Sequence, residues 1–169
     1  MTNTKYGASA STIYKFECFD KHGKLKWVEE NHNLVVNVGL DDVLEKYFKG
    51  SAYTASHFVG LTDGNPTIAA SDTMASHVGW VEVSGYSEAN RQALTLGSVA
   101  SQSVGNSASK ASFSINATVT IGGGFVVDNS TKSGSTGILY GVAAFAGGDR
   151  SAINSDTLNV TVTLSQSAV

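Results

Sequence analysis

With 169 residues, the chain is long enough to bury one full hydrophobic core, and we expect a single globular domain. Only 15% of the residues are charged, so neutral Ser, Thr, Asn and Gly must cover much of the surface. The net charge is −3, and the lysines before residue 50 are interleaved with acidic residues. This pattern argues against a one-signed phosphate-binding surface and therefore against direct nucleic-acid binding.

The N-terminal residues, the lengths of apolar runs and the cysteine count bear on further classes of protein. The first residues lack the apolar segment of a secretory signal, and no run approaches the ~18 apolar residues of a membrane span. We therefore expect no membrane association, and synthesis and folding in a cytoplasm. Cys18 is the only cysteine, which excludes an intrachain disulfide and a multi-cysteine metal site. We expect Cys18 to be a small buried hydrophobic residue.

The chain begins with small polar residues and then changes to an aromatic hairpin. Residues 1–11 predict a flexible N-terminal arm, followed by one domain over residues 12–169. Residues 13–30 predict a β-hairpin, because apolar and charged residues alternate on both sides of a glycine-containing turn. The hairpin presents one aromatic and apolar face and has a solvated histidine at its tip; these residues are Tyr14, Phe16, Leu25, Trp27 and His22.

A short helix is predicted at about residues 39–49. Its apolar residues recur at helical spacing and form one stripe, comprising Leu40, Val43, Leu44, Tyr47 and Phe48. Gly50 is well placed to end the helix in the left-handed conformation. A helix of about 10–12 residues is marginal alone, so we expect the stripe to be buried against a sheet.

The rest of the chain predicts short β-strands separated by Gly-, Ser- and Asn-rich turns. The clearest alternation runs over residues 112–121, and a second covers residues 158–164. About eight to ten strands and one early helix predict a mainly β fold. We expect an antiparallel two-layer β-sandwich, jelly-roll-like, with the helix covering an edge or an open end. The pattern does not fix the strand order.

No pattern of catalytic, cofactor-binding or metal-ligating residues is found in the sequence. His57 and His77 lie near Asp63 and Asp72 but lack the spacings of known zinc sites. The glycines at 122–124 are followed by Phe-Val-Val rather than the Lys-Ser/Thr of a phosphate-binding loop, so we interpret them as a kink between strands. We therefore predict no enzyme activity and no cofactor.

Several aromatic residues allow two interpretations. They can line a sugar-binding groove, because aromatic rings stack on the apolar faces of sugars, or they can pack in the core and at interfaces. The residues are Trp27, Tyr53, Phe58, Trp80 and Tyr86. We favour packing and keep a carbohydrate-binding module as an alternative function.

Segments spread over nearly the whole chain after residue 12 resemble a known family. They are Phe16–Asp20, Lys26–Asn37, Phe58–Thr62, Thr73–Trp80, Asn106–Thr118 and Gly147–Arg150. The chain resembles small proteins encoded in the structural-gene regions of tailed bacteriophages. The resemblance implies a virion component made in the host cytoplasm, and it implies no catalytic residues.

Within that resemblance we expect a capsid decoration, or cement, protein. Its partners would be the major capsid protein or other virion proteins, and it would form a homo-oligomer, a trimer or a dimer. The expected surface for binding the shell is the hairpin, with Tyr14, Phe16, Leu25, Trp27 and His22, together with the N-terminal arm. A tail, neck or fibre-anchoring protein is one alternative, and a carbohydrate-binding module on the virion surface is another.

Overall fold

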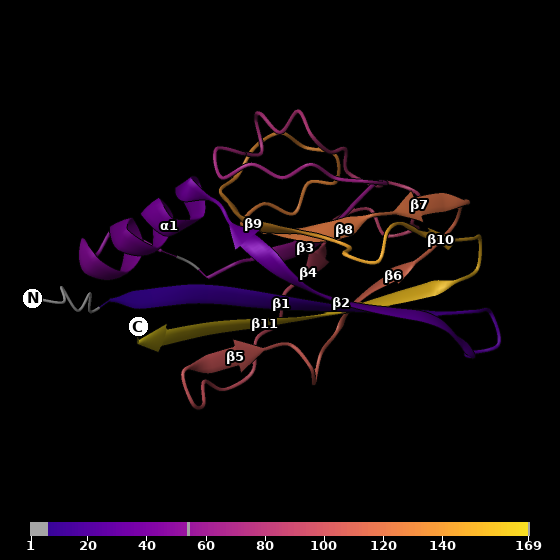
Figure 1. The fold of residues 1–169 in the computed structure, drawn as a ribbon, viewed down its shortest axis with the longest axis horizontal. Coiled ribbons are helices and arrows are strands. Elements are labelled where there is room, and N and C mark those ends of the chain that lie inside the picture. The colour runs from indigo at the N-terminus through magenta and orange to yellow at the C-terminus, as the bar shows by residue number, and fades with distance from the viewer. Residues whose placement is uncertain (1–6, 54, 169) are drawn as a thin grey trace, which may run out of the picture.

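In the computed structural model, which describes residues 7–53 and 55–168, the chain is mainly β-sheet with one short helix (Figure 1). The predicted secondary-structure class is therefore confirmed. The strands are β1 (Ala8–Phe19), β2 (Leu25–Val35), β3 (Phe58–Thr62), β4 (Gln92–Ala93), β5 (Ser103–Gly105), β6 (Ala111–Ser114), β7 (Val119–Ile121), β8 (Gly123–Val127), β9 (Leu139–Ala144), β10 (Arg150–Ala152) and β11 (Thr157–Ala168). The helix consists of α1 (Asn37–Val43) and a π-helical turn, η1 (Leu44–Phe48).

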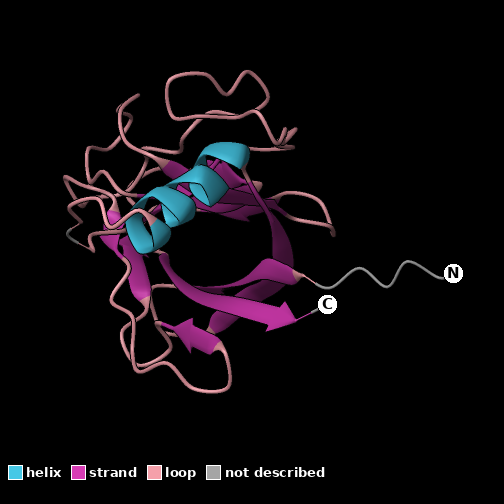
Figure 2. Cartoon of the chain, turned by 90° about the vertical axis from the view of Figure 1, so that its left-hand side faces the viewer, coloured by secondary structure: helices cyan, strands magenta, loops and turns pink. Residues whose placement is uncertain are grey.

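The strands form an antiparallel sheet that curls into a half-barrel. Its order is β4-β3-β8-β9-β2-β1-β11-β5, with β6 also paired to β11, and β7 and β10 form a separate pair. Figure 2 looks at one end of this half-barrel and shows the helix lying across it. The curvature depends on β2, which pairs with β1 near the hairpin turn and with β9 through residues 33–35.

The first and last strands of the chain are paired along their whole length. Ala8 lies opposite Ala168, and Phe19 lies opposite Thr157. This pairing corrects the predicted arm at residues 1–11: residues 8–11 are strand, because the C-terminal segment supplies their hydrogen-bonding partner. Residues 1–6 of that predicted arm lie outside the described residues.

The hairpin predicted at residues 13–30 is confirmed, and it supplies much of the core. Alternation along β1 turns Tyr14, Phe16 and Cys18 toward the concave side of the sheet, where all three are fully buried. Phe16 packs edge-on against Phe145, with ring centroids 4.8 Å apart. Cys18 is thus a buried free thiol, as expected. Its pKa is raised to about 11, mainly by burial and also by the nearby Asp156 carboxylate.

The long alternation at residues 112–121 forms two short strands rather than one. β6 pairs with β11, whereas β7 pairs with β10. Between them the backbone changes partner. The N–H of Ile115 donates to the carbonyl of Asp156, next to β11, whereas the N–H of Asn116 donates to the carbonyl of Gly85. A period-two pattern reports which side chains are buried and does not report which strand receives the backbone hydrogen bonds.

We predict unequal effects for two valines. Val160 in β11 is fully buried, whereas Val78 is fully exposed. Val160→Ala should lower the free energy of unfolding by about 2–3 kcal/mol, because it removes buried methyl groups and leaves a cavity. Val78→Ala should change it by less than about 0.5 kcal/mol. Urea denaturation of both variants measures the difference, and equal losses would contradict this assignment of the core.

Candidate functional site

The apolar stripe of the helix is largely uncovered, which contradicts the predicted burial against a sheet. The exposed fraction is 42% for Leu40, 54% for Leu44, 80% for Tyr47 and 73% for Phe48. Tyr47 and Phe48 pack on each other, edge to face, with ring centroids 5.0 Å apart. A group of large exposed apolar side chains on one helix face is typical of a surface that binds another protein.

The anchoring of the helix explains this exposure. Val36 just before α1 is fully buried, and Gly39 lies so close to the backbone of Tyr140 in β9 that a Cβ would be 2.5 Å from the Tyr140 carbonyl oxygen. These contacts hold the first turn against β9, while the rest of the helix runs across the open end of the half-barrel (Figure 2). The helix ends as predicted, with Gly50 at φ +71°.

A pocket of about 510 Å³ lies between the inner side of the helix and the half-barrel. Its apolar walls come from segments far apart in the sequence, including Val43, Leu94, Val126, Tyr140 and Leu164. Its volume is within the range of small-ligand pockets. The pocket lies beyond the first helical turn, where Gly39 packs against β9.

Neutral polar groups stand among these apolar walls. The Tyr53 hydroxyl lies 3.5 Å from Nδ1 of His57. Burial lowers the pKa of His57 below its ordinary value, and the carboxylates of Asp128 and Asp42 oppose that shift only in part. Burial also raises the pKa of Tyr140. Asp42 and Lys46 also line the pocket, which therefore offers apolar packing together with charged and uncharged hydrogen-bonding groups.

The hairpin residues predicted to bind a partner divide into buried and exposed sets. Tyr14 and Phe16 are in the core and have no surface to offer, because the alternation of β1 turns them inward. Trp27 is partly buried against Phe145, and its indole N–H donates to the carbonyl of Ser151 at 3.0 Å. Leu25 and His22 are exposed. Only Leu25, His22 and part of Trp27 remain as candidate contact residues.

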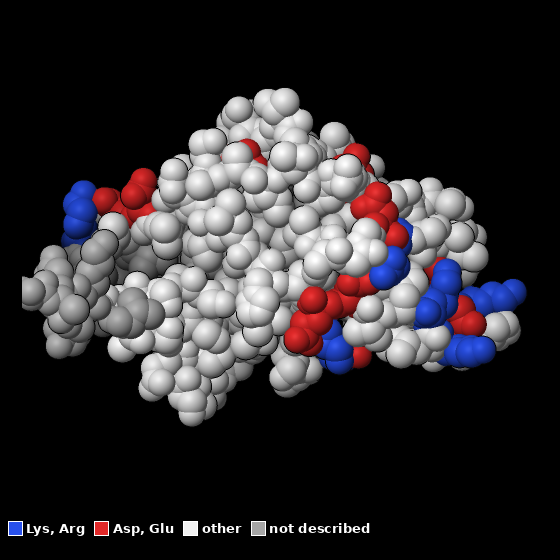
Figure 3. Space-filling model, in the orientation of Figure 1, with Lys and Arg blue, Asp and Glu red and all other residues white. Residues whose placement is uncertain are grey.

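The hairpin tip is a well-ordered turn with a positive charge. The Asp20 carboxylate accepts hydrogen bonds from the backbone N–H groups of His22 and Lys24, at 2.8 and 2.9 Å. Both hydrogen bonds lower the pKa of Asp20, and the bond from Lys24 has the larger effect. Lys21 and Lys24 are exposed beside them. Figure 3 shows charged side chains gathered toward the hairpin end, while a broad area between the hairpin and the helix is uncharged.

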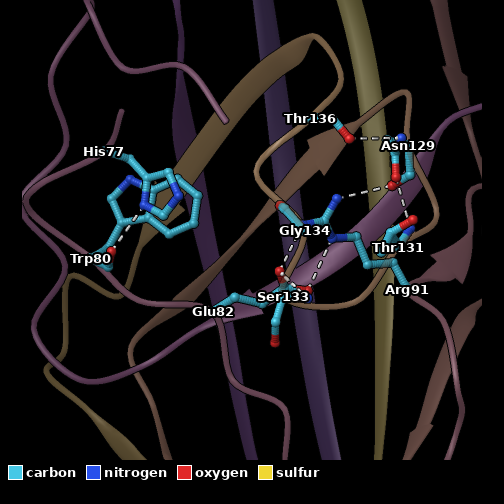
Figure 4. A network of polar contacts seen from close by, with 9 residues as sticks. All are labelled: His77, Trp80, Glu82, Arg91, Asn129, Thr131, Ser133, Gly134 and Thr136. Atoms are coloured by element: carbon cyan, nitrogen blue, oxygen red, sulfur yellow. Dashed lines mark hydrogen bonds and ion pairs between the residues drawn. The ribbon is translucent and has the colours of Figure 1, made fainter. Parts of the chain in front are cut away.

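The residues considered for acid–base or metal chemistry have structural partners instead. The ring of His77 stacks on Trp80, with ring centroids 3.8 Å apart (Figure 4). The Trp80 indole N–H donates to Asp72 at 3.2 Å. Asp63 accepts a hydrogen bond from the N–H of Val81. In residues 7–53 and 55–168, no three His, Cys, Asp or Glu side chains are grouped to hold a metal ion.

The aromatic set proposed as a sugar-binding groove is not assembled on one surface. Trp80 and Tyr86 are buried, and they pack against Phe125 and Phe113 respectively, each with ring centroids 5.0 Å apart. Trp80 therefore has almost no surface on which a sugar ring could stack.

No helix in the described part of the chain is long and apolar enough to span a membrane.

A buried arginine, which sequence reasoning missed, holds the long loops together. Arg91 is 2% exposed, and its guanidinium makes two hydrogen bonds to Glu82, of 3.0 and 2.7 Å. It also donates to the carbonyls of Asn129 and Gly134 (Figure 4) and lies over the ring of Phe125. Nothing in the local sequence distinguishes Arg91 from a surface arginine, because its partners come from distant loops.

We predict that breaking this ion pair from one side is costly. Arg91→Met leaves the Glu82 carboxylate buried without its cation and should lower the free energy of unfolding by about 3–5 kcal/mol. The double variant Arg91→Met/Glu82→Leu should lose less, because no uncompensated charge remains. Chemical denaturation of both variants tests this, and an equal or larger loss in the double variant would contradict it.

The pH dependence of stability should report the burial of His57. Its folded-state pKa is lowered, so below about pH 6.5 the unfolded chain takes up a proton that the folded chain does not. Stability should therefore fall as the pH drops from about 7 until the folded-state pKa is reached. His57→Gln should reduce that fall, whereas His22→Gln at the exposed tip should retain it. Thermal unfolding at several pH values compares them.

No family model, curated protein or solved structure matches this chain. A proposal about its function therefore has to start from the exposed residues of the structure. Two exposed regions lie at opposite ends of the molecule: the helix with its uncovered stripe and the positively charged hairpin tip (Figure 1).

Proposed function

We propose that the chain is a non-enzymatic structural protein of a phage virion, and specifically a capsid decoration protein that bridges major capsid protein subunits. The observation that carries the proposal is the uncovered stripe of Leu40, Leu44, Tyr47 and Phe48. Large apolar side chains that a monomer leaves in water are typical of a surface that another protein covers. The resemblance of the sequence to phage structural proteins supplies the setting.

The composition of the surface supports work within an assembly. Large apolar and aromatic side chains are enriched in the centres of protein interfaces. Covering each one stabilises a complex by about 1.5–3 kcal/mol before the cost of association is subtracted. That cost leaves modest affinity at one site, which is sufficient on a lattice where several sites bind together.

The hairpin tip is the surface we assign to the shell. Its backbone is fixed by the Asp20 turn, so little conformational entropy is lost on binding. Lys21, His22 and Lys24 precede Leu25 in the turn, and all four are exposed. Electrostatic complementarity therefore favours an acidic patch on the shell, with an apolar depression for Leu25.

We also propose that the fold be classed with two-layered, jelly-roll-like sandwiches. The half of the sheet from β4 to β9 and the half from β1 to β5 are joined through β2. Side chains of the two halves meet in one core, where the Tyr14 hydroxyl donates to the carbonyl of Gly141 at 3.3 Å. A solved structure would test this by the angle between the two halves.

We predict that the protein is present in purified virions in high copy number. Quantitative mass spectrometry against the major shell protein should give about one copy per shell subunit, or one per local threefold position. About a dozen copies per particle would indicate a tail or neck protein instead. Absence from virions would overturn the proposed function.

The hairpin assignment gives a second prediction. Lys21→Glu/Lys24→Glu should weaken binding to virions stripped of this protein by about tenfold or more at low salt, because it reverses the charge of the tip. Raising the salt concentration should reduce the effect. Lys49→Glu, at the helix end of the molecule, is the control and should bind like the unmodified protein. Equal binding by both variants would contradict the assignment.

A further inference from the structure

We infer that the pocket at the helix end is a binding site for a small molecule that has an apolar body, one hydroxyl or carbonyl group and no charge. This pocket, of about 510 Å³, lies where the helix crosses the open end of the half-barrel (Figure 2). The inference goes beyond the proposed structural role and does not depend on it, because bridging capsid subunits requires no small ligand.

The walls of the pocket are fixed by backbone hydrogen bonds. Residues 94–97 join the two edges of the half-barrel at this end. The N–H of Leu94 donates to the carbonyl of His57, just before β3, at 2.8 Å, and the N–H of Gly97 donates to the carbonyl of Gly105 in β5 at 2.9 Å. The pocket is therefore preformed, as most small-molecule sites are, and binding requires little ordering of the chain.

Apolar side chains make up most of the pocket wall. They come from the helix, from four strands or strand connections and from the segment that joins the sheet edges; among them are Val43, Leu94, Leu96, Val104, Val126 and Leu164. Burial of apolar surface is the main favourable term in binding to such a wall. The body of the ligand is therefore apolar.

Buried polar groups without partners lie beside the floor of the pocket. Thr12 in β1 is 1% exposed and lies opposite the pocket residue Leu164. Asn33 in β2 lies against Gly141 of β9, where a Cβ on the glycine would meet the Asn33 amide. In the part of the chain that the structure describes, Thr12 Oγ1 and both amide atoms of Asn33 are buried without a hydrogen-bond partner. Unpaired buried polar groups are costly, so a ligand group that bonds to this region is favoured.

Tyr140 connects these groups to the pocket, because its side chain lines the pocket and its hydroxyl lies near Thr12. Burial raises the pKa of Tyr140, and the Thr12 hydroxyl opposes that rise only in part. No hydrogen bond of ordinary geometry joins the two hydroxyl groups among the described residues. The Tyr140 phenol is therefore protonated at neutral pH and can donate to a hydroxyl or carbonyl oxygen of the ligand.

The charged groups of the pocket favour a ligand without charge. Asp42 and Lys46 both line the pocket from the helix, one turn apart, and no ion pair joins either to another described residue. A ligand ion of either sign would meet one attractive and one repulsive group, and it would also lose water to apolar walls. His57 adds no charge at neutral pH, because burial lowers its pKa.

Binding of three eight-carbon molecules to the purified full-length chain tests the inference. The molecules are 1-octanol, octanoate and octylammonium, which share an apolar body and differ in the charge of the head group. Isothermal titration calorimetry at about pH 7.5 should give a dissociation constant below about 1 mM for 1-octanol. The two ions should bind at least about tenfold more weakly, because each is desolvated beside apolar walls.

Variants of the pocket identify the site. Val43→Trp fills the pocket from the helix and should weaken 1-octanol binding by about tenfold or more. Leu44→Trp is the matched control, because Leu44 is the next residue, is 54% exposed and does not line the pocket; it should leave binding unchanged. Tyr140→Phe should weaken 1-octanol binding by about three- to tenfold, through the loss of one hydrogen bond. Leu96→Trp fills the pocket from its mouth and replaces Val43→Trp if circular dichroism shows that Val43→Trp is unfolded.

Four outcomes would each overturn the inference. They are no binding of any of the three molecules at about 1 mM, an ion bound as tightly as 1-octanol, equal binding by the pocket-filling variant and Leu44→Trp, and a Tyr140→Phe variant that binds 1-octanol like the unmodified protein. Virion content is measured separately, so none of these outcomes would alter the proposed structural function.

Discussion

The pairing of β1 with β11 is the constraint on which the rest of the structure depends. The two strands come from opposite ends of the chain and are in register from Ala8 opposite Ala168 to Phe19 opposite Thr157. β2 is attached to β1, and β5 and β6 are attached to β11, so the sheet extends outward from this pair in both directions. Contacts this far apart in sequence close a long loop, so we expect the sheet to form late and slowly in folding.

Buried ion pairs hold the loops in position where the chain forms few strands. Between β3 and β5 the chain is mostly irregular, and the Arg91–Glu82 pair holds it together with backbone hydrogen bonds to β3. At the hairpin end, Lys26 pairs with the buried Asp156, which also accepts a hydrogen bond from the backbone N–H of Ile153. Each pair joins segments that are distant in the sequence. Such pairs select one arrangement of the loops, even where their net contribution to stability is small.

The two ends of the molecule present different chemistry to possible partners. At the hairpin end, lysines surround a turn that the Asp20 carboxylate holds rigid. At the helix end, aromatic side chains lie in water beside an apolar pocket. A protein with one charged and one apolar contact surface at opposite ends can contact two different partners. We base the proposed decoration role on this division.

The sequence by itself determined the local features: the β-rich class, the hairpin, the shared strand face of Tyr14, Phe16 and Cys18, and a short helix ending at Gly50. These follow from side-chain periodicity and turn chemistry, which act over a few residues. Only the tertiary structure decided that the helix stripe stays exposed, that residues 112–121 divide between two partner strands, and that Arg91 is buried. Each depends on which distant segment lies opposite, and periodicity carries no information about that. The amphipathic pattern indicates that the apolar face of the helix favours burial. The position of the sheet relative to the helix decides whether this chain itself covers that face.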